Sequence, residues 1–216
     1  MASTAENPSV TGSFLPSLVP AIRALANLLR VSQVPGAIIG GVAASLQGQA
    51  RTTEDVDVLV RLDENALDRF LEMAKAEGFR PRIPDAIPFA RRSAVLLLEH
   101  EASRVGVDLT ISRMAFDSDA IDRARPVAIG DLRFSVVAPE DLIIMKAVAH
   151  RPQDLQDIHA VTRANPRLDV RRVRTHVQEF ARALDKPEIW ADIAPLLKSR
   201  VRRKPTMRKA KSRKKK

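Results

Sequence analysis

The spacing of apolar residues predicts alternating helices and strands, followed by helices alone. Apolar positions recur every three or four residues at 18–29 and 64–77, which predicts helices. Residues 55–62 (DVDVLVRL) alternate strictly and predict a strand. Shorter apolar runs predict further strands at 36–41, 93–98 and 105–112 and near 127 and 134, with short helices at 42–46 and 117–125.

After residue 138 the pattern is helical only. Pro139, Glu140 and Asp141 predict a helix start, because proline and acids favour the first turn. Further helices are expected at 140–149, 153–163, 169–184 and 188–197. The fold class is therefore α/β (α+β), with a mixed sheet flanked by helices. The expected segments are a disordered N-terminus (1–15), an α/β core (16–137), a helical C-terminal region (138–197) and a disordered basic tail (198–216).

Composition excludes several kinds of site. The chain has 216 residues, 45% of them hydrophobic, which supports a sizeable core. It has no cysteine, so disulfides, thiolate zinc sites and cysteine nucleophiles are excluded. Its four histidines lack zinc-ligand spacing.

The net charge of +10 is concentrated in the tail. Residues 198–216 contain 12 lysines and arginines and no acid, and without them 24 basic residues face 26 acidic ones. We therefore expect the tail to bind RNA or another polyanion, or else to be a solubilising extension. The uncharged stretch 31–50 contains too many polar residues and glycines for a membrane span, and the N-terminus does not resemble a signal peptide, so we expect a cytoplasmic protein without membrane contact.

Gly40 and Gly41 stand where an apolar strand turns into a helix. Such a turn exposes backbone N–H groups with no side chain in the way, which suits a phosphate. The alternative is a tight turn that requires a positive φ.

Asp55 and Asp57 are separated by one residue on a predicted strand, so both side chains project from one face. At ~5 Å and an effective dielectric near 20, their repulsion is roughly 3 kcal/mol. A divalent cation would relieve it, and paired oxygen ligands suit Mg²⁺ or Mn²⁺. The alternative is two solvated acids at a strand end.

Asp108, in VGVDLTI, has the same alternating context. If its strand neighbours the first, three carboxylates meet on one patch, which is the minimum for two metal ions acting on a phosphoryl group. The other acids of this region are expected to be solvated: Asp63, Asp68, Asp117, Asp119 and Asp122.

Lys146 is the only charge in LIIMKAVA. Such a lysine either extends its amine to solvent or has an anionic partner. Asp154 and Asp157 share one helix face downstream, and they could orient Lys146 or Arg151.

Two segments carry a family resemblance. The run IIGGVAASLQGQARTTEDVDVLV resembles the signature of the nucleotidyltransferase superfamily, and the element R-T-x-D-x-D from Arg51 is similar to its AbiEii-like branch of abortive-infection and toxin–antitoxin proteins. The run APEDLIIMKAVAHRPQDLQDI resembles a second motif of that branch. The resemblance covers about residues 37–161.

The resemblance implies a role for each candidate residue. Gly40 and Gly41 would contact a triphosphate, with Lys146 on the nucleotide phosphates. Asp108 would complete the metal site of Asp55 and Asp57 and help to activate an acceptor hydroxyl. Arg51 would bind phosphate or pair with Glu54. Secondary roles would fall to Arg151, Asp154 and Asp157.

The expected function is therefore metal-dependent transfer of an NMP unit from an NTP to a hydroxyl acceptor in RNA, a protein or a small molecule. In a toxin of this branch a cognate antitoxin would be a partner. The alternative is a non-catalytic module of the same fold that binds nucleic acid through its tail.

Overall fold

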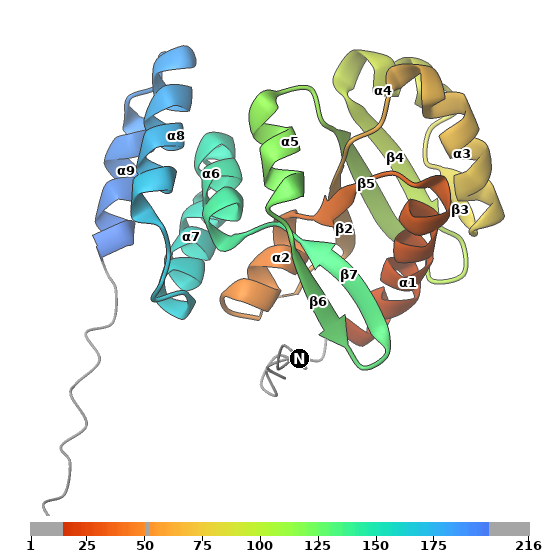
Figure 1. Cartoon of the computed structure of the whole chain (residues 1–216), viewed down its shortest axis with the longest axis horizontal. Coiled ribbons are helices and arrows are strands. Elements are labelled where there is room, and N and C mark those ends of the chain that lie inside the picture. Colours follow the sequence, from red (N-terminus) through yellow and green to blue (C-terminus); the bar gives the residue numbers. More distant parts are fainter. Residues whose placement is uncertain (1–14, 51, 199–216) are drawn as a thin grey trace, which may run out of the picture.

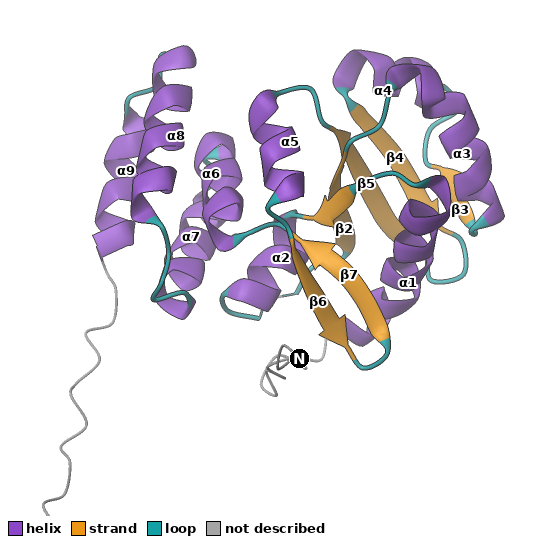
Figure 2. Cartoon of the chain, viewed as in Figure 1, coloured by secondary structure: helices purple, strands orange, loops and turns teal. Residues whose placement is uncertain are grey.

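The computed structural model describes residues 15–50 and 52–198. One mixed sheet of seven strands, in the order β3-β4-β5-β2-β1-β7-β6, forms its centre (Figure 2). β2 runs parallel to β5, and β1 parallel to β7, while the remaining neighbours are antiparallel. The strands are β1 (Gly36–Ile38), β2 (Asp55–Val60), β3 (Phe79–Pro81), β4 (Val95–His100), β5 (Val105–Ile111), β6 (Arg125–Ile129) and β7 (Leu132–Val136).

Helices pack against the sheet and continue beyond it. Figure 1 shows α8 and α9 at the end of the molecule opposite β3 and β4, with α6 and α7 between them and the sheet. The helices are α1 (Leu15–Ser32), α2 (Gly40–Gln47), the 3-10 turn η1 (Glu64–Ala66), α3 (Leu67–Ala76), α4 (Ala86–Ser93), α5 (Ala115–Asp122), α6 (Pro139–Ala149), α7 (Pro152–Ala164), α8 (Val170–Ala183) and α9 (Glu188–Lys198).

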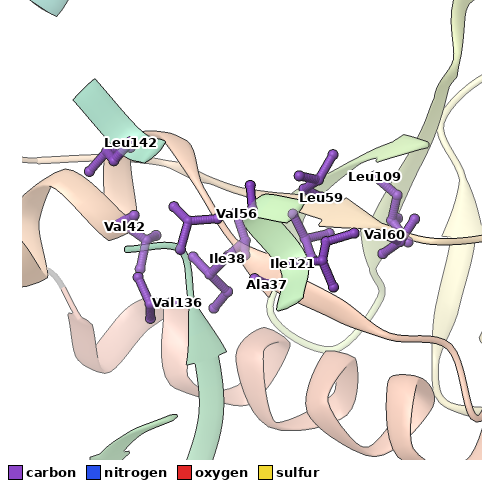
Figure 3. Packing of buried hydrophobic residues seen from close by; sticks show 14 of the residues in the cluster. Ala37, Ile38, Val42, Val56, Leu59, Val60, Leu109, Ile121, Val136 and Leu142 are labelled. Atoms are coloured by element: carbon purple, nitrogen blue, oxygen red, sulfur yellow. The ribbon is translucent and has the colours of Figure 1, made fainter. Parts of the chain in front are cut away.

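The core forms where the alternating strands turn their apolar face to helices. Val56, Val58 and Val60 of β2 are fully buried, as is Leu109 of β5. Figure 3 shows several of these side chains packed with Ile38, Ile121 and Leu142. Because strand side chains alternate between faces, burial of these residues turns the aspartates between them to the opposite face.

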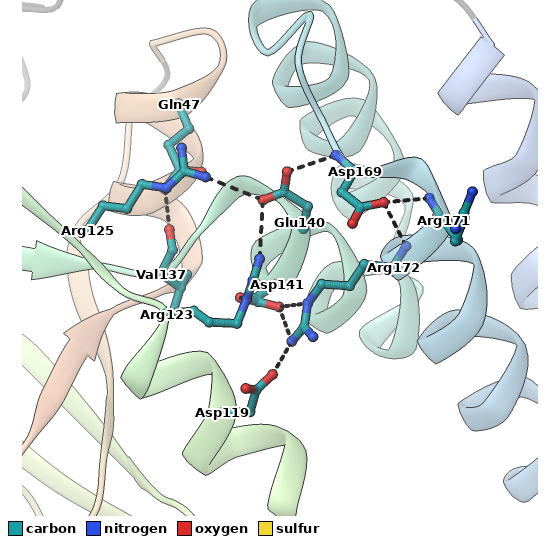
Figure 4. A network of polar contacts seen from close by, with 10 residues as sticks. All are labelled: Gln47, Asp119, Arg123, Arg125, Val137, Glu140, Asp141, Asp169, Arg171 and Arg172. Atoms are coloured by element: carbon teal, nitrogen blue, oxygen red, sulfur yellow. Dashed lines mark hydrogen bonds and ion pairs between the residues drawn. The ribbon is translucent and has the colours of Figure 1, made fainter.

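A polar cluster joins α6 to α8 and α5 (Figure 4). Asp141 is fully buried, and Arg172 of α8 and Arg123 donate to it. Glu140 accepts the backbone N–H of Asp169 at 2.9 Å, and Asp169 caps α8. Each buried carboxylate therefore has partners on another element, which fixes the helical region against the core.

The mixed sheet, the flanking helices and the helical C-terminal region confirm the expected fold class. The apolar pattern did not predict β3 or α4, since β3 has three residues and α4 follows two closely spaced prolines that argue against a helix. β4 starts at Val95, two residues later than predicted, because Ser93 ends α4. The segments 1–14 and 199–216 lie outside the described residues. Within the described ranges no helix is long and apolar enough to cross a membrane.

Candidate active site

Three aspartates meet where β2 runs beside β5. Asp57 lies directly opposite Asp108 in the parallel register, and Asp55 lies opposite Gly106. Directly opposite residues project from the same side of a sheet, and so do residues two apart on one strand. All three carboxylates therefore share one face, as the sequence predicted for Asp108 if its strand neighbours the first.

The turn from β1 into α2 closes over Asp57. Gly40 has a φ of +62°, and a Cβ built there would lie 2.6 Å from the carboxyl carbon of Asp57. The Ile39 N–H donates to the backbone oxygen of Asp57 at 2.9 Å, and the Gly41 N–H donates to the Asp57 side chain. Gly40 therefore has the positive φ of a tight turn, and its missing side chain leaves room for the Asp57 carboxylate at the helix N-terminus, while a contact with phosphate stays a prediction.

Burial raises the pKa of Asp57 above its ordinary value, and the nearby charge of Asp55 raises it further. The Gly41 N–H opposes this shift, as do the positive charges of Lys146 and Arg151. Burial also raises the pKa of Asp108, with Asp57 and Asp55 adding to it and Arg82 opposing it. Both carboxylates therefore favour a proton or a further cation.

Arg82, just beyond β3, is a functional candidate that the sequence analysis missed. Its guanidinium forms an ion pair with Asp108, and both side chains are about one third exposed. A Cβ built at Gly106 would lie 3.2 Å from Nη1 of Arg82 and 3.1 Å from the carboxyl carbon of Asp55. Arg82 and Asp55 therefore flank the same small space above Gly106.

Lys146 has anionic partners, which was one of the two possibilities that the sequence left open. Its Nζ lies 2.9 Å from Oδ1 of Asp154 and 2.7 Å from Oδ2 of Asp157. All three side chains are buried. Asp154 also lies 3.3 Å from Nε of Arg151 and accepts the Arg151 backbone N–H at 3.2 Å. The two aspartates thus orient Lys146, and Asp154 orients Arg151 as well.

A cavity of about 270 Å³ lies between these two groups of charges. Gly40 and Asp57 form part of its wall, and Lys146, Arg151 and Asp154 line it too. Asp117 also lines it and is buried, which corrects the expectation of a solvated acid. Its carboxylate accepts the backbone N–H groups of Arg113 and Met114, each at 3.1 Å.

The three strand aspartates fit a divalent cation in donor chemistry, although no group of three acids or histidines among the described residues is gathered closely enough to hold one. Asp55 and Asp57 supply hard oxygens, and a cation between them would offset both the burial and the neighbouring charge of Asp55 that raise the pKa of Asp57. Asp108 already has Arg82 as its cation. A metal would therefore be held by Asp55 and Asp57, with Asp108 joining once it separates from Arg82.

The alternation of apolar and polar residues explains which site residues the sequence predicted and which it did not. Alternation found the aspartates, whereas Arg82 follows a strand too short to show a period. Arg80 and Arg82 stand two apart, which was the only available signal. Arg51 lies outside the described residues.

The sheet, the glycine turn into α2 and the aspartates beside it are the features on which the sequence resembles the nucleotidyltransferase superfamily. The chain belongs to a family described as "Nucleotidyl transferase of unknown function (DUF2204)", which matches residues 19–188. This confirms the superfamily that the sequence resembles, while the AbiEii-like branch stays a prediction.

Solved structures show the same fold. An antigenic nucleotidyltransferase-like protein from Paracoccidioides brasiliensis matches at 16% identity and a TM-score of 0.53, over 86% of this chain and 94% of that one. The antibiotic-resistance factor ANT(2'')-Ia matches at 14% identity and a TM-score of 0.55, over 81% and 96%. Its complex with adenylyl-2''-tobramycin matches at 14% identity and 0.53, over 78% and 99%. No curated protein sequence matches the chain.

Proposed function

We propose that this protein transfers an NMP unit from an NTP to a hydroxyl acceptor with the help of a divalent cation. The observation that carries the proposal is the register of β2 and β5, which sets Asp57 opposite Asp108 with Asp55 on the same face. Family membership supports nucleotidyl transfer in general. Mg²⁺ or Mn²⁺ would neutralise charge on the phosphates and on the oxygens that attack and leave.

In this proposal the triphosphate enters the cavity of about 270 Å³ beside Gly40. Arg151 is 70% exposed in its side chain, so it can turn toward a phosphate at small cost. Lys146 keeps its place between Asp154 and Asp157 while its side chain lines the cavity, where its ammonium would meet a phosphate. Gly41 positions Asp57 through its N–H, and the remaining amides of the turn face the phosphates.

The acceptor binds on the side of the aspartates away from the cavity, where Asp108 lies beside Arg82. Asp108 accepts or orients the hydroxyl proton, so the oxygen attacks the α-phosphorus and pyrophosphate leaves. Positioning and charge compensation supply the rate enhancement, since no covalent intermediate with the protein is needed.

The first test measures label transfer. The protein is incubated with α-labelled NTPs, a divalent cation and one of three acceptor classes: RNA, protein from a lysate, or an aminoglycoside such as tobramycin. Label in one class identifies the acceptor, and Asp57→Asn should abolish it. Asp68→Asn is the matched control, because Asp68 is an exposed residue of α3 that pairs with Arg91. The absence of transfer to every class would favour the non-catalytic alternative.

The basic tail favours a polyanionic partner. Residues 198–216 hold 12 of the 36 lysines and arginines of the chain. Binding through such a segment releases counterions, so six phosphate contacts would give a log–log salt slope of about −4 on single strands. Deleting these residues should abolish the slope and spare transfer to a small acceptor. An unchanged slope would assign RNA binding to the folded part.

A toxin role and a cognate antitoxin are proposed only on the AbiEii-like motif. Expression of the intact chain and of Asp57→Asn in bacteria tests them together. Growth arrest that depends on Asp57 supports a toxin. Equal growth with both proteins favours a housekeeping or resistance enzyme.

A further inference from the structure

Charge balance singles out Arg82 on the face of the sheet that carries the three strand aspartates. Asp55, Asp57 and Asp108 place three carboxylates on that face, and Arg82 forms an ion pair with Asp108. Lys146 and Arg151 act on Asp57 from the cavity side, whereas Arg82 acts on Asp108 from the β3 side. The site is therefore approached by cations from two directions, and only one of these directions belongs to the proposed nucleotide cavity.

Arg82 is held at this place by the sheet. Its backbone N–H donates to the Leu97 oxygen at 3.0 Å, which extends the pairing of β3 with β4 by one residue. Leu97 lies directly opposite Asp108 in the next pair of strands. Arg82, Leu97 and Asp108 thus form one row across the sheet, which aims the guanidinium at the carboxylate.

Gly106 makes the approach possible. It lies opposite Asp55 in the register, and a Cβ there would meet both the carboxyl group of Asp55 and Nη1 of Arg82. Without a side chain at this position, the guanidinium can reach the space between Asp55 and Asp108. A cation shared by these two carboxylates would need that same space.

We propose that Arg82 is a built-in counter-ion of Asp108, which holds this carboxylate until a divalent metal bound by Asp55 and Asp57 displaces it. The inference rests on the proposed function, because it requires the strand aspartates to bind a metal. Arg82 is a positioning residue here: it orients the Asp108 carboxylate and compensates its charge before the metal arrives. Displacement then frees the guanidinium on the acceptor side.

The test titrates the full chain with Mn²⁺ alone and follows free Mn²⁺ by electron paramagnetic resonance. Arg82→Ala should bind Mn²⁺ about tenfold more tightly than the wild type, equivalent to about 1.4 kcal/mol. Arg82→Lys should lie between the two, because lysine keeps the charge but lacks the planar fork. Arg80→Ala is the matched control, since Arg80 lies two residues before Arg82, on β3, and pairs with Glu99 of β4 at 2.9 Å. It should change the affinity less than twofold.

Thermal unfolding gives a second readout. Arg82→Ala should lower the melting temperature by about 2 °C in metal-free buffer, and saturating Mn²⁺ should abolish that difference. Equal gains in affinity for Arg82→Ala and Arg80→Ala would reduce the effect to general electrostatics and overturn the inference. So would an unchanged or weaker affinity in Arg82→Ala.

Asp57→Asn separates this inference from the proposed function. In one outcome the wild type binds Mn²⁺, Asp57→Asn abolishes this binding, and Arg82→Ala leaves the affinity unchanged. The metal site is then supported, and only the role of Arg82 is wrong. If neither the wild type nor Arg82→Ala binds Mn²⁺ through Asp57, the metal part of the proposed function is wrong and the inference falls with it.

Discussion

Two clusters of aspartates in this molecule differ in how their charge is compensated. Asp141, between α6 and α8, is fully buried and accepts hydrogen bonds from Arg123 and Arg172. Asp57, on β2, has a neighbouring carboxylate in Asp55 and one backbone N–H, and its pKa is raised. The first cluster is paired within the chain, whereas burial and the charge of Asp55 keep the pKa of Asp57 raised although Lys146 and Arg151 oppose the shift.

The two clusters therefore have different roles, one in stability and one in binding a ligand. A buried carboxylate with arginine partners stabilises the contact between elements, although replacing the whole cluster by apolar residues would cost little. Carboxylates set on one face with insufficient compensation repel one another, and folding tolerates this where a ligand restores the balance. Lys146 combines both situations, because two aspartates neutralise it while its side chain lines the cavity.

The largest expected effect is on activity. Asp57→Asn should reduce transfer about a thousandfold or more, equal to at least ~4 kcal/mol at the barrier, because the metal loses a ligand. Its stability in metal-free buffer should stay equal or rise, since one of two repelling charges is gone and the amide oxygen still accepts the Gly41 N–H. Activity assays and urea unfolding check both halves. A loss of stability would make Asp57 structural and remove the contrast with Asp141.

Lys146→Ala should lower the free energy of unfolding by about 3 kcal/mol, because Asp154 and Asp157 stay buried without their shared ammonium. An amine that extended to solvent would cost little to remove, so the size of the loss tests the pairing of Lys146 with the two aspartates. Urea denaturation measures the change. Lys75→Ala is the matched control, because Lys75 forms an exposed pair with Glu72 and should change stability by less than about 0.5 kcal/mol. Equal effects of the two substitutions would refute the pairing.

Arg172→Ala should cost about 2 kcal/mol of stability, because Asp141 keeps only Arg123 as a charged partner. Activity per folded molecule should remain within a few-fold of the wild type. Arg171→Ala controls for the loss of a neighbouring exposed arginine on α8. Lost activity in a fully stable Arg172→Ala protein would show that this cluster also serves the site.

The smallest effect is a pH dependence. The pKa of Asp57 is raised above the ordinary 3.8, so the contribution of this group to stability is complete below that value and is lost as pH rises through the folded-state pKa. In metal-free buffer Asp57→Asn should therefore match the wild type near pH 4 and become the more stable protein toward pH 7. Unfolding at several pH values measures the difference. A constant difference would mean that Asp57 carries no raised pKa.

The sequence by itself determined most of the elements, apart from β3 and α4, and which face each aspartate takes. Strict alternation in DVDVLVRL and VGVDLTI fixes the burial of the valines, so the intervening aspartates must point the other way. The glycine pair marked the turn into α2, and Pro139 with its acids marked the start of α6. Each of these signals lies within a few consecutive residues, so a short stretch of sequence is sufficient to predict it.

Only the tertiary structure decided which charges meet. The pairing of β2 with β5 sets Asp57 opposite Asp108 across a long chain separation, and no periodicity encodes that register. The partners of Lys146, the burial of Asp117 and the contact of Arg82 with Asp108 likewise depend on how elements pack. The physical reason is that alternation and helical spacing fix the direction of a side chain relative to its own element, whereas an ion pair depends on the distance between two elements.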